Sequence, residues 1–305
     1  MHDAQPSGER RGAPRESAPP GTAGEMLAKA REFLERKSVP GARLDAELLV
    51  AHALELDRLH LFLQLDRPTS EVEVARAREL LVRRAHREPT AYLTGRKEFY
   101  GRSFAVTRDV LVPRPETELA VDLARERLRG RAAPRVGDVG AGSGCIAITL
   151  ALECAGAQVR AVDVSAPALA VARANAHTLG AQVEFVEGDG PRALGAGPFD
   201  LIVSNPPYVR PDELAALEPE VRDWEPRLAL LLPEGRPDHW LERLLDEALP
   251  LLGPGGALLV ELGAGQSARA LELAAQRGCS ARAHRDLAGV PRLLEMQLAS
   301  APGAD

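Results

Sequence analysis

Short apolar segments alternate with helical patterns from residue 136 to residue 298, and this alternation limits the possible folds more than any other feature of the sequence. Apolar runs of about four to eight residues between turn residues are typical of buried strands. Chains that alternate strand and helix build parallel sheets with right-handed crossovers. The sequence therefore predicts an α/β fold with a doubly wound, mostly parallel, seven-stranded sheet. The strands are expected at residues 136–139, 159–164, 183–186, 199–204, 256–262, 282–287 and 292–298, the last two as an antiparallel pair at one edge.

Helices are expected between these strands. Ser165 is a typical N-cap and Gly180 a typical residue after a helix end, so a helix is predicted between them. Pro115, followed by Glu116 and Glu118, is typical of a helix start. Further helices are expected at residues 145–152, 237–252 and 266–277.

The residues before the α/β region have a different pattern. Apolar side chains recur at helical spacing over residues 23–88, and Ser70 with Glu73 matches a capping box, so a small all-helical bundle is predicted. The arginines near its end are expected to face water: Arg76, Arg83, Arg84 and Arg87.

The remaining boundaries follow from composition. Residues 89–111 are expected to form a hairpin linker and residues 112–299 the α/β domain. Residues 1–22 are rich in Pro, Gly, Arg and Glu, which predicts a disordered tail, and residues 300–305 form a second tail.

Charge and composition exclude several classes of protein. The chain has 305 residues and a net charge of −6, which does not fit a strongly basic nucleic-acid-binding surface. No apolar run approaches the roughly 20 residues that span a bilayer, and the N-terminus lacks a secretory signal. The three cysteines form no CxxC pair and the seven histidines show no ligand spacing, so neither a disulfide nor a metal site is expected. We expect a cytoplasmic monomer that binds neither membranes nor nucleic acid.

A glycine-rich turn, Gly140-Ala141-Gly142-Ser143-Gly144, joins the first strand to a helix. Such a turn lets backbone N–H groups approach a ligand at the positive end of the helix dipole. Its spacing differs from the dinucleotide pattern GxGxxG. Asp163 ends the second strand, where a carboxylate can accept from ribose hydroxyls. Asp189 follows the third strand and could accept from an adenine amino group. Because the carboxyl ends of parallel strands share one edge, these features are expected to line one crevice.

Asn205-Pro206-Pro207-Tyr208 follows the fourth strand. Two prolines cannot continue a strand, so the backbone must leave the sheet at Asn205. The Asn205 side-chain oxygen and the Pro206 carbonyl can each accept a hydrogen bond from one NH2 group, and the Tyr208 ring can stack on a planar amide or base. This arrangement suits methyl transfer to a planar nitrogen, although an ordinary Pro-Pro turn would give the same four residues.

Several further motifs accompany these residues, and together they resemble the release-factor glutamine methyltransferases, a class I S-adenosylmethionine-dependent family. The resemblance covers about residues 24–299. It depends on the glycine turn, on residues 205–208, and on the sequence segments at 43–49, 92–95, 98–101, 113–118, 220–223, 225–230 and 286–289 with Arg292.

The resemblance implies a reaction and its participants. The substrate would be the glutamine of the Gly-Gly-Gln loop of peptide chain release factors, and the cofactor would be S-adenosyl-L-methionine. Residues 112–299 would be the methyltransferase domain, and the helical bundle would help to dock the release factor. Asn205, Pro206 and Tyr208 would be catalytic, and Asn205, Pro206, Pro207 and Tyr208 would grip the substrate amide. The cofactor would contact Gly140, Ala141, Gly142, Ser143, Gly144, Asp163, Asp189, Gly190 and Asn205.

Four positions or stretches depart from the family pattern, and two of them, Ala141 in place of the common Thr and Gly137 in place of a bulky apolar residue, look tolerable because backbone groups do the binding there. Gly190 stands where Trp or Leu is common, which leaves the adenine contact open. Residues 231–236 replace a Gly-rich, Asp-containing stretch.

Three alternatives stay open at this point. The same tetrapeptide occurs in adenine-N6 methyltransferases of DNA or RNA, where it would hold a flipped base. Glutamine methylation of a ribosomal protein would use the same chemistry with another docking partner. A non-catalytic binding module could keep the fold.

Overall fold

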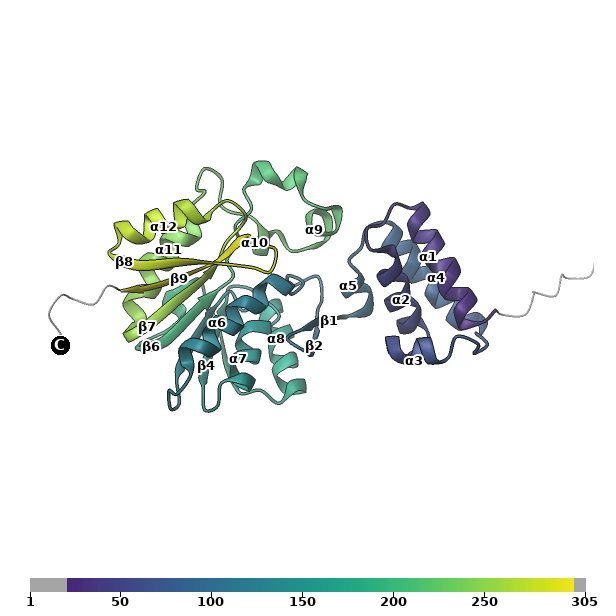
Figure 1. Ribbon diagram of the computed structural model, residues 1–305, viewed down its shortest axis with the longest axis horizontal. Coiled ribbons are helices and arrows are strands. Elements are labelled where there is room, and N and C mark those ends of the chain that lie inside the picture. The colour runs from purple at the N-terminus through teal and green to yellow at the C-terminus, as the bar shows by residue number, and fades with distance from the viewer. Residues whose placement is uncertain (1–20, 299–305) are drawn as a thin grey trace, which may run out of the picture. The chain divides into compact units, whose positions relative to one another are not determined.

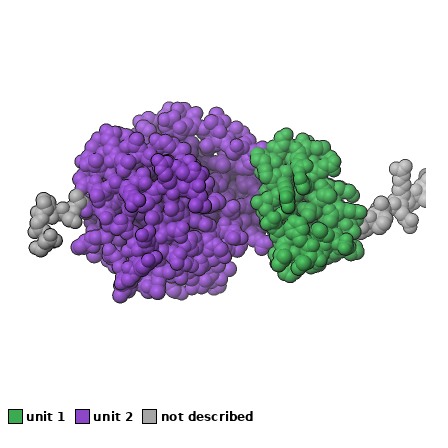
Figure 2. Space-filling model, in the orientation of Figure 1, with its two compact units in different colours: residues 1–86 green, residues 87–305 purple. Residues whose placement is uncertain are grey.

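The computed structural model describes residues 21–298 and divides into two compact units, residues 1–86 and residues 87–305 (Figures 1 and 2). The predicted tails lie outside the described residues, except for Gly21 and Thr22. Thr22 already belongs to the folded part, because its side chain accepts a hydrogen bond from the Glu25 backbone N–H at 3.2 Å and caps the first helix.

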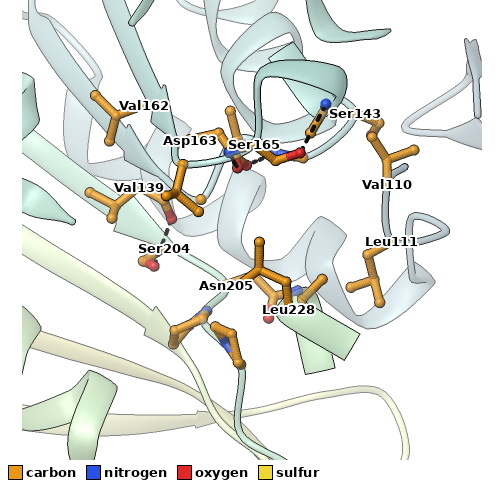
Figure 3. A pocket seen from close by; sticks show the side chains of 18 of the residues that line it. Val110, Leu111, Val139, Ser143, Val162, Asp163, Ser165, Ser204, Asn205 and Leu228 are labelled. Carbon is orange, nitrogen blue, oxygen red and sulfur yellow. Dashed lines mark hydrogen bonds between the residues drawn. The ribbon is translucent and has the colours of Figure 1, made fainter. Parts of the chain in front are cut away.

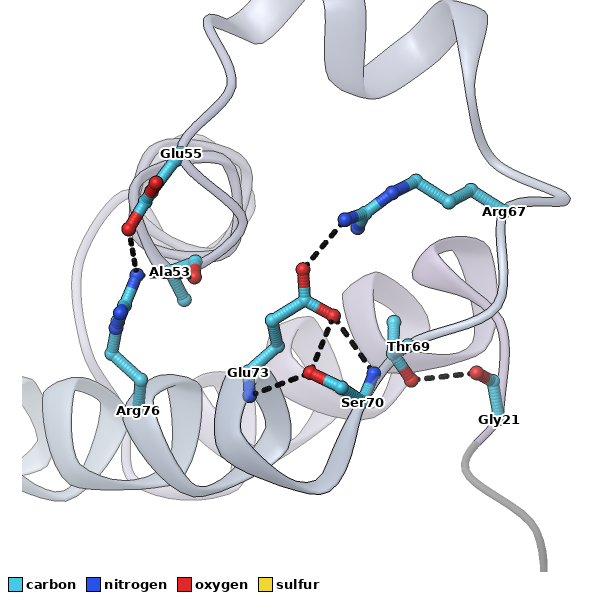
Figure 4. Close-up of polar contacts among 8 residues, drawn as sticks. All are labelled: Gly21, Ala53, Glu55, Arg67, Thr69, Ser70, Glu73 and Arg76. Carbon is cyan, nitrogen blue, oxygen red and sulfur yellow. Dashed lines mark hydrogen bonds and ion pairs between the residues drawn. The ribbon is translucent and has the colours of Figure 1, made fainter.

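The first unit is helical, as predicted. Its helices are α1 (Ala23–Arg36), α2 (Ala42–Ala53), α3 (Arg58–Leu63) and α4 (Glu71–Ala85). The capping box at the start of α4 is confirmed. The Glu73 N–H donates to the Ser70 hydroxyl at 3.3 Å, and the Glu73 carboxylate accepts from the Ser70 N–H at 2.7 Å (Figure 4). Arg67 donates to the same carboxylate.

The prediction that the arginines near the end of α4 face water is wrong for Arg84. That side chain is buried and forms an ion pair with Asp45 of α2 at 2.7 Å. Arg76 is exposed, and it pairs with Glu55 (Figure 4). An arginine on a helix reaches far enough to pair with a neighbouring helix, which helical spacing alone does not reveal.

The second unit begins with α5 (Thr90–Thr94) and the antiparallel hairpin of β1 (Arg96–Phe99) and β2 (Arg102–Ala105). The predicted hairpin is therefore confirmed. Phe99 and Phe104 are buried and their rings pack edge to face, with centroids 6.0 Å apart. They join the core cluster that also contains residues of α6 (Glu118–Leu128).

A seven-stranded sheet with the strand order β5-β4-β3-β6-β7-β9-β8 forms the centre of this unit (Figure 1). The predicted fold class is confirmed: the first five strands in this order are parallel, and β9 pairs antiparallel with both β7 and β8 at the edge. The strands are β3 (Arg135–Val139), β4 (Gln158–Asp163), β5 (Val183–Glu187), β6 (Phe199–Ser204), β7 (Leu252–Glu261), β8 (Cys279–Arg285) and β9 (Pro291–Leu298).

The boundary between the predicted helix at 237–252 and the strand after it lies elsewhere in the structure. Helix α11 (His239–Ala248) ends two residues before Pro250, a 3-10 turn (Leu249–Leu251) follows, and β7 starts at Leu252. Proline cannot continue a helix, because it lacks the N–H and its ring clashes with the preceding turn. The strand was predicted from residue 256, but the glycines at 253, 255 and 256 belong to the irregular start of β7, where the register with β6 shifts.

Helices cover both faces of the sheet. One core cluster packs the strands against α6, α7 (Cys145–Glu153) and α8 (Ala166–Leu179), and the other packs them against α11 and α12 (Ser267–Gln276). Strand β6 serves both clusters, because Leu201 and Val203 point to one face and Ile202 to the other. The strand ends are thereby fixed from both sides, which makes the carboxyl edge of the sheet a rigid support.

Candidate functional site

A pocket lies at the carboxyl edge of the sheet, where β3, β4, β5 and β6 end (Figure 3). It brings together ten of the twelve site residues predicted from the sequence; the exceptions are Gly144 and Tyr208. In the view of Figure 3, Asp163 and Ser143 lie above the pocket, Asn205 and Leu228 below it, and Val110 and Leu111 to the right. The predicted residues that line it are Gly140, Ala141, Gly142, Ser143, Asp163, Asp189, Gly190, Asn205, Pro206 and Pro207.

Gly144 follows the lining residues as the N-cap residue of α7 and does not line the pocket. A Cβ atom at Gly144 would lie 2.7 Å from Ile148 Cδ1 and 3.2 Å from Ala172 Cβ. Its φ of 80° also disfavours any side chain. Ten of the twelve predicted residues thus line the pocket, and Gly144 lets the turn pack closely against α7 and α8.

The Asp163 carboxylate holds the glycine turn in place. Its Oδ2 accepts from the Gly142 N–H at 2.8 Å, and its Oδ1 accepts from the Ser165 N–H at 2.9 Å. Each carboxylate oxygen has a second lone pair. Asp163 lines the pocket, so it can accept further hydrogen bonds from a ligand such as a ribose.

Asp189 and Gly190 contact α11, which the sequence did not indicate. The Arg243 guanidinium lies 2.7 Å from both Asp189 Oδ1 and the Asp189 carbonyl oxygen, and 5.2 Å above the centre of the Trp240 ring. A Cβ atom at Gly190 would lie 2.5 Å from Arg243 Nη2. Glycine at 190 therefore leaves room for Arg243, and Trp240 supplies an aromatic side chain to the pocket.

Asn205 starts the segment that leaves the sheet after β6. The buried Ser204 hydroxyl donates to the Val139 carbonyl at 2.8 Å and ties the ends of β6 and β3 together. Asn205, Pro206 and Pro207 line the pocket beside the glycine turn. Tyr208 lines an adjoining cavity instead, and its ring packs against Gly263, where a Cβ atom would lie 2.9 Å from Tyr208 Cδ2.

Two buried polar residues next to Asn205 were not among the predicted site residues. The Asn205 amide nitrogen lies 3.3 Å from the Thr117 hydroxyl, and that hydroxyl lies 2.7 Å from Glu261 Oε2 at the end of β7. Burial raises the pKa of Glu261 to about 7. Thr117 lies within a motif that carries the family resemblance, but nothing in the sequence links it to Glu261, which is 144 residues away.

Asp138 is another buried acid at this edge. It accepts from the Ala147 N–H at 3.1 Å with one carboxylate oxygen, and its other oxygen has no partner among the described residues. Burial and the nearby Asp163 raise the pKa of Asp138 to about 7, although the Ala147 hydrogen bond opposes the shift.

The outer wall of the pocket is apolar and is held by Glu225. Val110, Leu111 and Pro113 line one side, and Leu228 and Ala229 line another. The buried Glu225 carboxylate accepts from the Val112 N–H at 3.2 Å and forms an ion pair with Arg114. The two wall segments are therefore connected although they are far apart in the sequence.

The pocket thus has two chemically different halves. The glycine turn, Asp163, Asp189 and Trp240 provide backbone amides, carboxylates and a ring, which suit a nucleoside with a polar tail. Asn205 and the two prolines provide hydrogen-bond acceptors on a stiff segment, which suit a planar NH2 group. Among the described residues, no cluster of acidic, histidine or cysteine side chains could hold a metal ion. No helix in the described part of the chain is long and apolar enough to cross a membrane.

Comparison with protein families gives two matches. Residues 25–95 match the PrmC N-terminal domain, and residues 117–218 match the methyltransferase small domain.

Known proteins match over most of the chain. A release factor glutamine methyltransferase from Geobacter sulfurreducens is 44% identical over 272 residues, which are 88% of this chain and 94% of that protein. One from Chlorobaculum tepidum is 45% identical over 260 residues, which are 82% of this chain and 88% of that protein. The solved hMettl16 catalytic domain, in complex with MAT2A 3'UTR hairpin 6, is 18% identical with a TM-score of 0.54 and covers 75% of this chain and 82% of that chain. This last likeness shows the fold alone.

Proposed function

The chain belongs to the release factor glutamine methyltransferase family, and from that premise we propose that it transfers a methyl group from S-adenosyl-L-methionine to the glutamine of the Gly-Gly-Gln loop of peptide chain release factors. One observation carries the proposal. The glycine turn with Asp163 and the Asn205–Pro207 segment line the same pocket, so a methyl donor and an amide acceptor can meet there.

The residues present fit S-adenosylmethionine. The turn exposes backbone at Gly140 and Gly142, Asp163 has free lone pairs for ribose hydroxyls, and Asp189 and Trp240 lie beside the place for a base. When bound, this cofactor supplies an electrophilic methyl group on a sulfonium, which leaves as a neutral thioether.

The residues around Asn205 can position the glutamine amide nitrogen, which is the nucleophile of the reaction. An amide nitrogen is a poor nucleophile because its lone pair is delocalised into the carbonyl group. We propose that Asn205 Oδ1 and the Pro206 carbonyl oxygen each accept a hydrogen bond from one N–H of the substrate glutamine. Together they would hold its nitrogen in line with the methyl group. The nitrogen so held would bond to the methyl carbon that the bound cofactor supplies, with the thioether as leaving group, and would then release a proton to water. Alignment of this kind can contribute roughly 7–11 kcal/mol to catalysis.

The proposal extends to the surroundings of the reaction. Residues 23–88 would help to dock the release factor, residues 89–111 would link the domains, and residues 112–299 would carry the chemistry. Tyr208 would complete the grip on the amide from the adjoining cavity. The net charge of −6 supports a protein substrate over nucleic acid. Release factors act in translation, which supports a cytoplasmic location, and light scattering tests the proposed monomer.

Mass spectrometry tests the central claim. The purified chain is incubated with S-adenosylmethionine and a peptide chain release factor, and the release factor is then digested. We expect a gain of one methyl group on the loop glutamine, and none on a release factor in which that glutamine is replaced by alanine. A methyl group at another position, or none on either protein, would contradict the proposal.

A further inference from the structure

We propose that Thr117 and Glu261 are positioning residues that fix which end of the Asn205 amide faces the pocket. The inference deepens the proposed function and rests on it for its effect on the rate, whereas the chain of hydrogen bonds itself can be tested without any substrate.

Three side chains from distant parts of the sequence form this chain. Glu261 Oε2 and Thr117 Oγ1 lie 2.7 Å apart, and Thr117 Oγ1 and Asn205 Nδ2 lie 3.3 Å apart. Thr117 is 3% exposed and Glu261 is 4% exposed. Water therefore does not compete for these groups, and their directions depend on one another.

The Thr117 hydroxyl does not bond to the first turn of its own helix. Thr117 is the last residue of the 3-10 turn Pro115–Thr117, which leads directly into α6, and its backbone is helical, with φ −68° and ψ −19°. Here it makes no side-chain cap, and its hydroxyl contacts Glu261 and Asn205 instead.

The number of protons on each group decides which side chain donates and which accepts in these hydrogen bonds. An ionised carboxylate can only accept, so the Thr117 hydroxyl must donate its one proton to Glu261. The hydroxyl oxygen can then only accept, and it must receive an N–H from Asn205 Nδ2. Asn205 Oδ1 consequently becomes the end that is left for the substrate, which is the acceptor that the glutamine NH2 group requires.

Protonation of Glu261 removes this constraint. A neutral carboxyl group can donate to Thr117, whose proton is then free for Asn205 Oδ1, and the amide can turn its NH2 group toward the pocket. An NH2 group cannot accept from the substrate amide, so the turned state is unproductive.

The surroundings of Glu261 place this change near neutral pH. Burial raises the pKa of Glu261 to about 7, the Thr117 hydrogen bond lowers it, Glu116 raises it, and Arg292 and Arg114 lower it. Both arginines are engaged elsewhere, Arg292 with Asp286 and Arg114 with Glu225. Tyr208 and Cys145 also lie within electrostatic range of Glu261.

Steady-state kinetics of methyl transfer with the full chain test the effect on the rate. We expect Thr117→Val to lower kcat by about 10-fold to 100-fold, with the KM for the release factor and the affinity for S-adenosylmethionine nearly unchanged. Thr117→Ser keeps the hydroxyl and should restore most of the rate. Thr149→Val is the matched control, because Thr149 is a buried threonine whose hydroxyl has no partner among the described residues. Equal losses in Thr117→Val and Thr117→Ser, or an unchanged kcat in Thr117→Val, would overturn the inference.

The pH profile adds a second readout. In the native chain kcat should fall as the pH drops through about 7, as Glu261 gains its proton. Glu261→Gln never ionises, and its amide oxygen can still accept from Thr117, so its kcat should be flat over the same interval. If kcat of Glu261→Gln still falls as the pH drops through about 7, as in the native chain, the proposed role of Glu261 is contradicted.

Nuclear magnetic resonance of the free protein separates this inference from the proposed function. In the native chain the side-chain NH2 signals of Asn205 should shift as the pH passes through the pKa of Glu261. In Thr117→Val this pH-dependent shift should be lost. If the Asn205 signals do not change with pH near 7, the inference is overturned, even if the release factor is methylated. A native chain that shows the shift but methylates no release factor would overturn the proposed function alone.

Discussion

The Asp163 carboxylate accepts a hydrogen bond from the Gly142 N–H at 2.8 Å, and this contact fixes the glycine turn to the end of β4. The second carboxylate oxygen accepts from Ser165. Asp163 therefore shapes the turn as well as offering its remaining lone pairs to a ligand.

Replacement of Asp163 by asparagine should affect both roles. An NH2 group would face one of the two backbone N–H donors, so we expect the free energy of unfolding to fall by about 1–3 kcal/mol. The affinity for S-adenosylmethionine, measured by calorimetry, should fall about 10-fold because a charged acceptor is lost. Asp212→Asn is the control, because Asp212 pairs with Arg210 on the surface and should matter little. Unchanged cofactor affinity in Asp163→Asn would contradict the ribose contact.

Asn205→Ala tests the acceptor half of the site. The substitution removes the Oδ1 acceptor and leaves the glycine turn and Asp163 untouched, so methyl transfer should fall by at least about 100-fold while cofactor affinity stays within about 2-fold. Transfer is followed with S-adenosylmethionine labelled in the methyl group, and the cofactor affinity of the same variant is the internal control. Normal turnover would exclude Asn205 from the reaction.

The features that were predicted correctly from the sequence depend on residues that are close together in the sequence. The glycine turn, the capping box of α4 and the ends of α8 each follow from residues within a few positions of one another. Strand β6 was predicted with its observed limits, because an apolar run meets two prolines that must end it.

The features that sequence reasoning missed depend on contacts between distant segments. Arg243 reaches Asp189 across 54 residues, and Thr117 reaches Glu261 across 144. Arg84 was expected to face water because helical spacing reports which face a residue lies on, and not which partner a long side chain can reach on another helix.

Ser70→Ala tests the capping box in the first unit. Loss of the hydroxyl leaves the Glu73 N–H without its cap, and the Glu73 carboxylate loses its bond to the Ser70 hydroxyl (Figure 4). We expect the free energy of unfolding of this unit to fall by about 1 kcal/mol, measured by hydrogen exchange of the α4 amides. Ser70→Asp, which can also cap a helix, should retain most of the stability. Equal losses in both variants would show that the cap is not the cause.

Asp138 gives a dependence of stability on pH that can be isolated. Its pKa is about 7 in the folded chain and 3.8 for an ordinary aspartate, so the folded state keeps the proton over an interval in which the unfolded state has lost it. The resulting stabilisation is complete below the ordinary value and is lost as the pH rises through about 7.

Chemical denaturation at several pH values should reveal this loss when the native chain is compared with Asp138→Asn. Because asparagine does not titrate, the stability of the native chain relative to the variant should fall by up to about 1.4 kcal/mol for each pH unit between about 4 and about 7, and then level off. The other acids are common to both proteins, so their contributions cancel to first order. Asp66→Asn, a surface control, should run parallel to the native chain. A difference that rises with pH would mean that Asp138 is ionised in the fold, and its unpartnered oxygen would then need a cation or donor close to it.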